Sequence, residues 1–244
     1  MTPADLIQIV RQDFLDDVSD AVDGPDSDAT WSNEFLLRQV GEAQRQACYR
    51  QDLRHLFDDT TEAICEITLA SGTQSYALDS RILRIHDAQY GGEAVVHTTQ
   101  DALDRAFHDW RTLTGAPEQF FIRGRMLTLD RIPGTAEDGE TLALSVWREP
   151  LATPGMNDDL EWTLDPEKLG HWVAHRAFMR PNLSKEAPGL SKQHRDLFDL
   201  AFGREVPAAA RAELLAYPDR VGLGPVTVRN HRWAFQCEDF DTGG

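Results

Sequence analysis

Residues 30–50, TWSNEFLLRQVGEAQRQACYR, predict the helix around which the rest of the chain is organised. Ser32 is suited to cap the start of this helix, because its hydroxyl can accept a hydrogen bond from a backbone N–H of the first turn. The apolar residues recur at helical spacing and form one stripe on an otherwise polar helix: Leu36, Val40, Ala43 and Ala47. We therefore expect this helix to pack against other helices along the stripe and to carry no active site.

Further helices are predicted on both sides of a strand-rich middle. Thr2 caps the first one, with Pro3 at the position where a missing N–H has no cost. Thr98 caps a short helix, and the sequence PNLSKEAPGL, residues 181–190, is expected to break any helix. Three more helices are predicted near residues 166–180, 191–202 and 207–216. The helices should share one core, formed by Leu6, Val10, Leu36, Val40, Trp172 and Phe178.

The middle of the chain alternates apolar and polar residues between glycine turns, as β-strands do. Residues 63–69 and 74–78 are predicted to pair as a hairpin around Gly72. A second hairpin is predicted around Gly91 and Gly92. The remaining strands are expected at residues 81–85, 119–123, 126–129 and 141–147.

These elements predict an α+β fold in which a helical bundle contains an inserted antiparallel β-sandwich-like unit. We expect the bundle to comprise residues 1–62 and 152–203 and the β-rich domain to comprise residues 63–151. Residues 204–244 should add a C-terminal helix and an extended arm.

The predicted arm carries β-branched and aromatic residues with no expected neighbour: Val226, Val228, His231, Trp233 and Phe235. A lone strand offers unpaired N–H and C=O groups that a second chain can complete. We therefore expect the arm, about residues 219–237, to become ordered against a partner. The alternative is that the arm folds back onto its own β unit.

The formal net charge of −17 opposes a role in gripping nucleic acid, because phosphate binding needs a basic surface. No apolar run approaches the roughly 20 residues that span a bilayer, so we expect no membrane partner. The N-terminus has neither the basic region nor the apolar core of a secretory signal, which predicts a protein made in the cytoplasm. The three cysteines, Cys48, Cys65 and Cys237, predict neither a disulfide framework nor a zinc site.

One pair of residues has the spacing of a metal site. His171 and His175 stand at i and i+4 on a predicted helix, so both rings can face the same way. Trp172 occupies the position where the metalloprotease motif requires a glutamate base, and packing explains the helix without a metal. No set of nucleophile, base and orienting group can be assembled, so we predict no enzyme, no metal and no cofactor. A metal-dependent hydrolase using His171 and His175 stays the alternative.

A series of short motifs resembles the head-to-tail adaptor proteins in the necks of tailed bacteriophages, and is similar to the tail tubular protein A group. The motifs cover roughly residues 2–203, and each is weak alone. In order they are Trp31-Ser32, Leu36-Leu37, Glu42-Ala43-Gln44, Ser75-Tyr76, Leu78-Asp79, Arg81 to Ile85, Ala102 to Arg105, Trp110-Arg111, Gly115-Ala116-Pro117 and a helical pair from Asp165 to Phe202.

The resemblance implies a structural virion protein that forms a ring of twelve copies between the portal and the tail. Such a ring seals the packaged genome and passes double-stranded DNA without binding it specifically. Its implied partners are the portal protein, a downstream tail or nozzle protein and further copies of the chain. For the arm, the portal is the first expected partner and a neighbouring subunit the second. A tail or baseplate binding module, which would form trimers or hexamers, is a further alternative.

Overall fold

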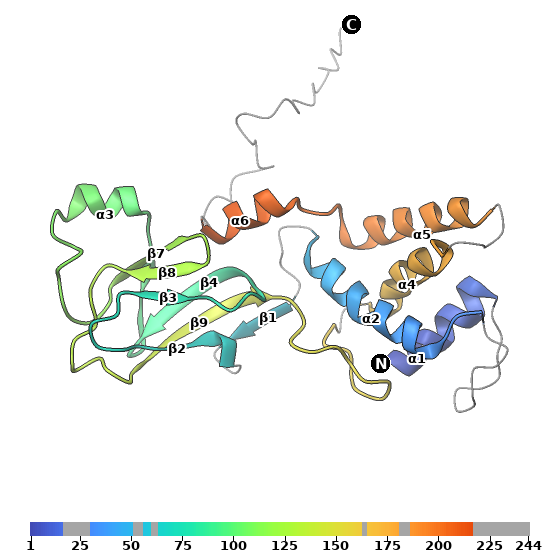
Figure 1. The fold of residues 1–244 in the computed structure, drawn as a ribbon, viewed down its shortest axis with the longest axis horizontal. Coiled ribbons are helices and arrows are strands. Elements are labelled where there is room, and N and C mark those ends of the chain that lie inside the picture. The colour runs from blue at the N-terminus through green and yellow to red at the C-terminus, as the bar shows by residue number, and fades with distance from the viewer. Residues whose placement is uncertain (17–29, 51–55, 60–62, 163–164, 181–185, 217–244) are drawn as a thin grey trace, which may run out of the picture.

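A computed structural model describes residues 1–16, 30–50, 56–59, 63–162, 165–180 and 186–216 of the 244-residue chain. Most helices gather at one end of the molecule and the strands at the other, where α3 (Gln100–Ala106) and α6 (Ala208–Ala216) also lie (Figure 1). The predicted α+β class is confirmed. Within the described ranges, no helix has both the length and the apolar character needed to cross a membrane.

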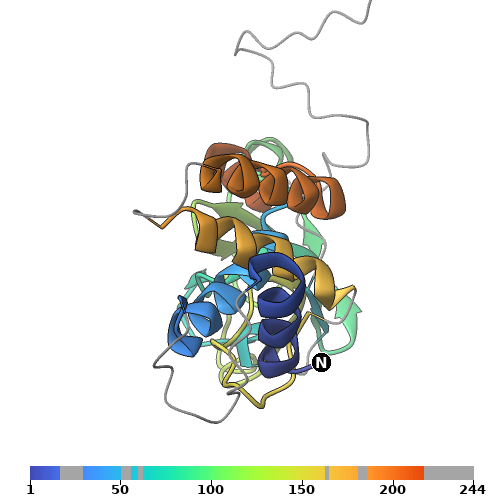
Figure 2. The ribbon, with the colours of Figure 1, turned by 90° about the vertical axis from the view of Figure 1, so that its right-hand side faces the viewer.

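The helical end is built from segments on both sides of the strands. The first helix, α1 (Pro3–Ile9), continues as a π-helical turn, η1 (Val10–Leu15), and α2 spans Asn33–Cys48. A 3₁₀ turn, η4 (Pro166–Lys168), leads into α4 (Leu169–Phe178), and α5 spans Ala187–Phe202. Viewed end-on, α4 lies between α5 on one side and α1 and α2 on the other (Figure 2).

Local capping sets two of the helix starts, as predicted. Thr2 Oγ1 accepts a hydrogen bond from Asp5 N at 3.2 Å, and Asp5 Oδ2 accepts one from Thr2 N at 2.9 Å. This reciprocal pair satisfies two backbone N–H groups at the start of α1. Ser32 Oγ accepts from Phe35 N at 3.3 Å at the start of α2.

One hydrophobic core holds these helices together and confirms the predicted set. Leu6, Val10, Leu36 and Val40 are completely buried in it, while Trp172 and Phe178 are partly buried and pack against it. At Gly170, α4 comes close to the first helix. A Cβ at Gly170 would lie 3.0 Å from side-chain atoms of both Phe14 and Val10, so glycine allows α4 to approach the first helix.

The strands form two sheets. The first has the order β1-β9-β4-β5, with β2 also paired to β9. Its strands are β1 (Leu56–Asp59), β2 (Glu66–Thr68), β4 (Ile82–Tyr90), β5 (Glu93–Ala94) and β9 (Thr141–Arg148). The second has the order β3-β8-β7-β6, and its strands are β3 (Ser75–Ala77), β6 (Val96–His97), β7 (Gln119–Arg123) and β8 (Met126–Leu129). All neighbouring strands are antiparallel except β6 and β7.

A second hydrophobic core contains inward-facing residues from both sheets: Ile82, Ile85, Leu127, Leu129, Leu142, Leu144 and Val146. The short helix α3 (Gln100–Ala106) packs through a smaller cluster of Leu103, Trp110 and Phe121. Trp110 meets Phe121 edge to face with ring centres 5.7 Å apart. The C-terminal helix α6 contacts β4 and β7 and contributes Leu215 to the second core.

The predicted hairpin of residues 63–69 and 74–78 is wrong. Residues 63–65 form a 3₁₀ turn, β2 pairs with β9, and β3 pairs with β8 in the other sheet. The connection between them is held elsewhere, because Gly72 N donates to Pro133 O at 2.9 Å and Leu69 N donates to Glu140 O at 2.8 Å. The chain therefore crosses from one sheet to the other at this turn.

Of the other predictions of local structure, one hairpin is confirmed, and a helix cap and a helix start are corrected. The predicted hairpin around Gly91 and Gly92 is present, and the strands predicted at residues 119–123 and 126–129 pair with each other as β7 and β8. The cap of α3 is Thr99 and not Thr98, since Thr99 Oγ1 accepts from Ala102 N at 3.2 Å. The helix predicted to start near residue 191 begins at Ala187, because Pro188 occupies its first turn, where a helix needs no N–H.

Candidate functional site

The residues predicted to form the docking arm lie outside the described part of the chain. Val226, Val228, His231, Trp233 and Phe235 all follow residue 216, where the described structure ends. Their role stays a prediction.

The two histidines of the alternative metal site point at different neighbours. His171 Nδ1 lies 3.1 Å from Nδ1 of His194 on α5, whereas His175 Nδ1 contacts Ser191 Oγ at 2.9 Å. Phe14 stacks on the His171 ring with centres 4.9 Å apart. The rings therefore join α4 to α5 and to the first helix.

Burial lowers the pKa of His171 and of His175, and it lowers the pKa of His194 to about 4. A neutral histidine has one donor and one acceptor nitrogen, so the 3.1 Å contact between His171 and His194 is a hydrogen bond when both are neutral. Among the described residues, no three His, Cys, Asp or Glu side chains are grouped so that they could hold a metal ion. Sequence reasoning missed His194 because it lies 23 residues after His171.

A buried arginine joins the end of α2 to α5. Arg50 is 1% exposed, and its guanidinium lies 3.3 Å from Asp199 and 3.7 Å from Glu205. It also lies over the Phe198 ring at 5.3 Å. Burial lowers the pKa of Arg50, and the two carboxylates oppose this effect. Removing one partner of a buried ion pair leaves an uncompensated charge, so this contact fixes the position of α2 relative to α5.

A second buried arginine ties the strands to the segment that leads back to the helices. Arg148 on β9 pairs with Asp58 on β1 and with Glu161 in the connecting segment. Burial alone lowers the pKa of Arg148, but its hydrogen bonds to both carboxylates raise it overall. Glu161 also accepts a hydrogen bond from Leu151 N at 2.8 Å. The connecting segment is therefore held at both ends.

Tyr49 lies where α2, the end of β9 and α6 meet. Its hydroxyl donates to Glu149 Oε1 at 2.7 Å, and the Arg211 guanidinium lies 4.0 Å from its ring centre. Val206 N donates to Tyr49 O at 2.9 Å. Since these contacts come from three separate regions, they couple the helical core to the strands.

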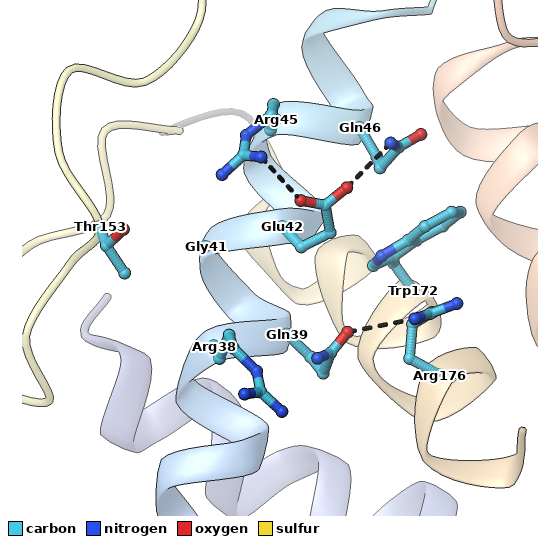
Figure 3. A pocket seen from close by; sticks show the side chains of 9 residues that line it. All are labelled: Arg38, Gln39, Gly41, Glu42, Arg45, Gln46, Thr153, Trp172 and Arg176. Carbon is cyan, nitrogen blue, oxygen red and sulfur yellow. Dashed lines mark hydrogen bonds and ion pairs between the residues drawn. The ribbon is translucent and has the colours of Figure 1, made fainter. Parts of the chain in front are cut away.

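An arginine-lined cleft of about 500 Å³ opens between α2, α4 and the segment near Thr153 (Figure 3). Its charged residues are three arginines and one glutamate: Arg38, Arg45, Arg176 and Glu42. The Trp172 ring lies between Glu42 and Arg176 in the view of Figure 3. A Cβ at Gly41 would lie 3.3 Å from Thr153 Cγ2, so the segment rests directly on α2.

Sequence reasoning treated α2 only as a packing helix and missed this cleft. A signal was present, because Arg38 and Arg45 are seven residues apart and so lie on one side of the helix. The contribution of Arg176 came from α4, more than a hundred residues later, and no local pattern shows that approach.

Comparison with known proteins bears on most of the chain. A family model described as SU10 adaptor protein matches residues 1–229, which include both the helical and the strand-rich parts. This match defines the class: a structural head-to-tail adaptor protein of bacteriophages, as the sequence motifs indicated. The chain belongs to the SU10 adaptor protein family. Among curated proteins, no match was found.

Proposed function

We propose that this adaptor assembles as a ring of twelve copies between the portal and the tail of the virion. In that position it closes the filled capsid and forms part of the channel through which DNA leaves. The observation that carries the proposal is the family match over residues 1–229. The two cores, joined through Arg148 and Tyr49, support it because a connector must transmit load between its ends without unfolding.

The charge of the chain suits a channel that DNA passes without adhering. Twelve copies at −17 each carry roughly 200 negative charges. Carboxylates on the channel wall repel the phosphates, and salt limits this effect to about 10 Å. We expect an acidic channel surface, and a ring whose channel is lined by arginines would contradict this expectation.

The proposed partners are the portal protein on one side, a downstream tail or nozzle protein on the other, and neighbouring copies of the chain. The protein is made in the host cytoplasm and ends in the virion neck. We further propose that residues 1–62 with 152–203 act as one domain and residues 63–151 as a second, with β1 of the first domain extending to pair with β9 of the second. Residues 204–244 then add α6 and the docking arm that attaches to the portal.

The mass of the assembled protein tests the proposed ring. Native mass spectrometry should show about 330 kDa of adaptor, twelve times the subunit mass of 27.4 kDa. This mass is expected as a free ring for the purified chain, or as an increase over the mass of the portal when the two proteins are mixed. A trimer or hexamer in both samples would favour a tail or baseplate binding module. A monomer with stoichiometric zinc would favour the hydrolase that uses His171 and His175.

A further inference from the structure

We infer that the arginine-lined cleft binds carboxylate side chains from a second copy of this chain, an inference that rests on the ring proposed above. The cleft would then be one half of the contact between neighbouring subunits. Acidic side chains of the adjacent copy would supply the other half.

The one carboxylate in the cleft is already engaged. Glu42 Oε2 lies 3.1 Å from Arg45 Nη1, and Glu42 Oε1 accepts from Gln46 Nε2 at 3.0 Å. Arg45 also lies 3.9 Å from Glu149 Oε2. Glu42 is therefore paired with Arg45 and leaves the two other arginines without an acidic partner.

Arg38 and Arg176 are exposed and form no ion pair within the described part of the chain. The Arg38 guanidinium lies over the Phe35 ring at 5.7 Å, and Arg176 Nε donates to Gln39 Oε1 at 3.4 Å, which is long for a hydrogen bond. The indole N–H of Trp172 is buried in the wall without an acceptor among the described residues. Each arginine can still bind a carboxylate through its fork of N–H donors.

The composition of the chain favours a second copy as the source of that carboxylate. Its 41 acidic residues outnumber 24 lysines and arginines, so a second copy offers more carboxylates than cations. In a ring, each subunit meets its neighbour through two different surfaces. A local basic cleft against an acidic neighbour makes that contact complementary, whereas contact between two acidic surfaces is repulsive.

Phosphate is a poorer fit for the same arginines. A protein that follows a nucleic-acid backbone needs a continuous basic track, and this cleft is short and includes Glu42. The wider surface would repel a polyanion, because the chain carries a net charge of −17. A few carboxylate side chains, in contrast, can enter a cleft of about 500 Å³.

The test compares ring assembly of the wild type with that of Arg38→Glu/Arg176→Glu and Arg38→Gln/Arg176→Gln. A matched control, Arg105→Glu/Arg123→Glu, changes two exposed arginines outside the cleft by the same charge. Subunit concentration at half-assembly is measured by light scattering, with the portal added if the wild type needs it. We expect this concentration to rise at least tenfold for Arg38→Glu/Arg176→Glu (the reversed pair) and by less for Arg38→Gln/Arg176→Gln (the glutamine pair). It should not change for the control.

Two further measurements separate the possible outcomes. Circular dichroism should show the same melting temperature for all four proteins, because the replaced side chains are exposed. Assembly of the wild type should weaken with salt, and the glutamine pair should lose most of that dependence. If the glutamine pair keeps the full dependence on salt, the inference is wrong.

A reversed pair that assembles at the wild-type concentration overturns the inference and leaves the proposed ring intact. The inference also fails if the reversed pair forms rings but loses portal docking, or loses binding to DNA instead. If the wild type forms no ring with or without its portal, the proposed function itself fails.

Discussion

Replacing Leu36 by alanine tests whether the stripe on α2 holds the helical end together. Leu36 is completely buried among the other helices, and α4 is held between α2 and α5. The space left by the missing methyl groups therefore has little freedom to collapse. Leu→Ala changes at buried positions cost about 2–5 kcal/mol, and we expect a loss of about 3 kcal/mol here. For a chain of this size, that loss lowers the melting temperature by roughly 6–12 °C.

Leu200 on α5 provides a matched control, because the same substitution there removes the same atoms from a side chain that is 81% exposed. Leu200→Ala should change the free energy of unfolding by no more than about 0.5 kcal/mol. Both variants are measured by thermal and urea unfolding followed by circular dichroism. If Leu36→Ala melts at the wild-type temperature, or no lower than Leu200→Ala, α2 does not pack as described.

Three other predictions concern pH, helix packing and the arm. Burial holds the pKa of His194 near 4, below its unfolded value near 6.5, so stability should fall by about 3 kcal/mol as pH drops through that interval. His194→Gln should reduce this dependence of stability on pH. If urea unfolding of the wild type does not change between pH 6.5 and 4, the His194 ring is not buried in its neutral form. Gly170→Ala should lower stability by about 1–3 kcal/mol, because the added methyl group crowds Phe14 and Val10. Gly189→Ala should raise stability by about 0.5–1 kcal/mol, because Gly189 lies in a helix with open space around it. Equal effects of the two changes in calorimetry would refute the close approach of α4. Deleting all residues after Pro218 should leave a folded protein that no longer binds the portal in a pull-down assay, and full binding would show that the arm is not the attachment device.

The sequence predicted the features that depend on neighbouring residues. Ser32 and Thr2 cap their helices because the hydroxyl and the N–H that it accepts from are only three residues apart. The stripe of α2 was also readable, since helical spacing alone places Leu36 and Val40 on one side. The motif order in turn led to the correct family.

The features that the sequence did not show depend on residues that are far apart along the chain. Strand β2 resembles half of a hairpin, but its partner β9 lies more than seventy residues later and outcompetes the nearby strand. Arg148 and Asp58 are 90 residues apart, and no pattern of spacing connects them. The cleft needs α4 to bring Arg176 beside Arg38, which is a property of helix packing and not of either helix alone.

The most direct test of the adaptor assignment is electron microscopy of this protein mixed with the portal protein of its own phage. We expect particles in which a ring of twelve adaptor subunits lies coaxially on the portal, with an open central channel. Particles that show a bare portal, although the adaptor is folded and in excess, would contradict the assignment of this chain as an adaptor.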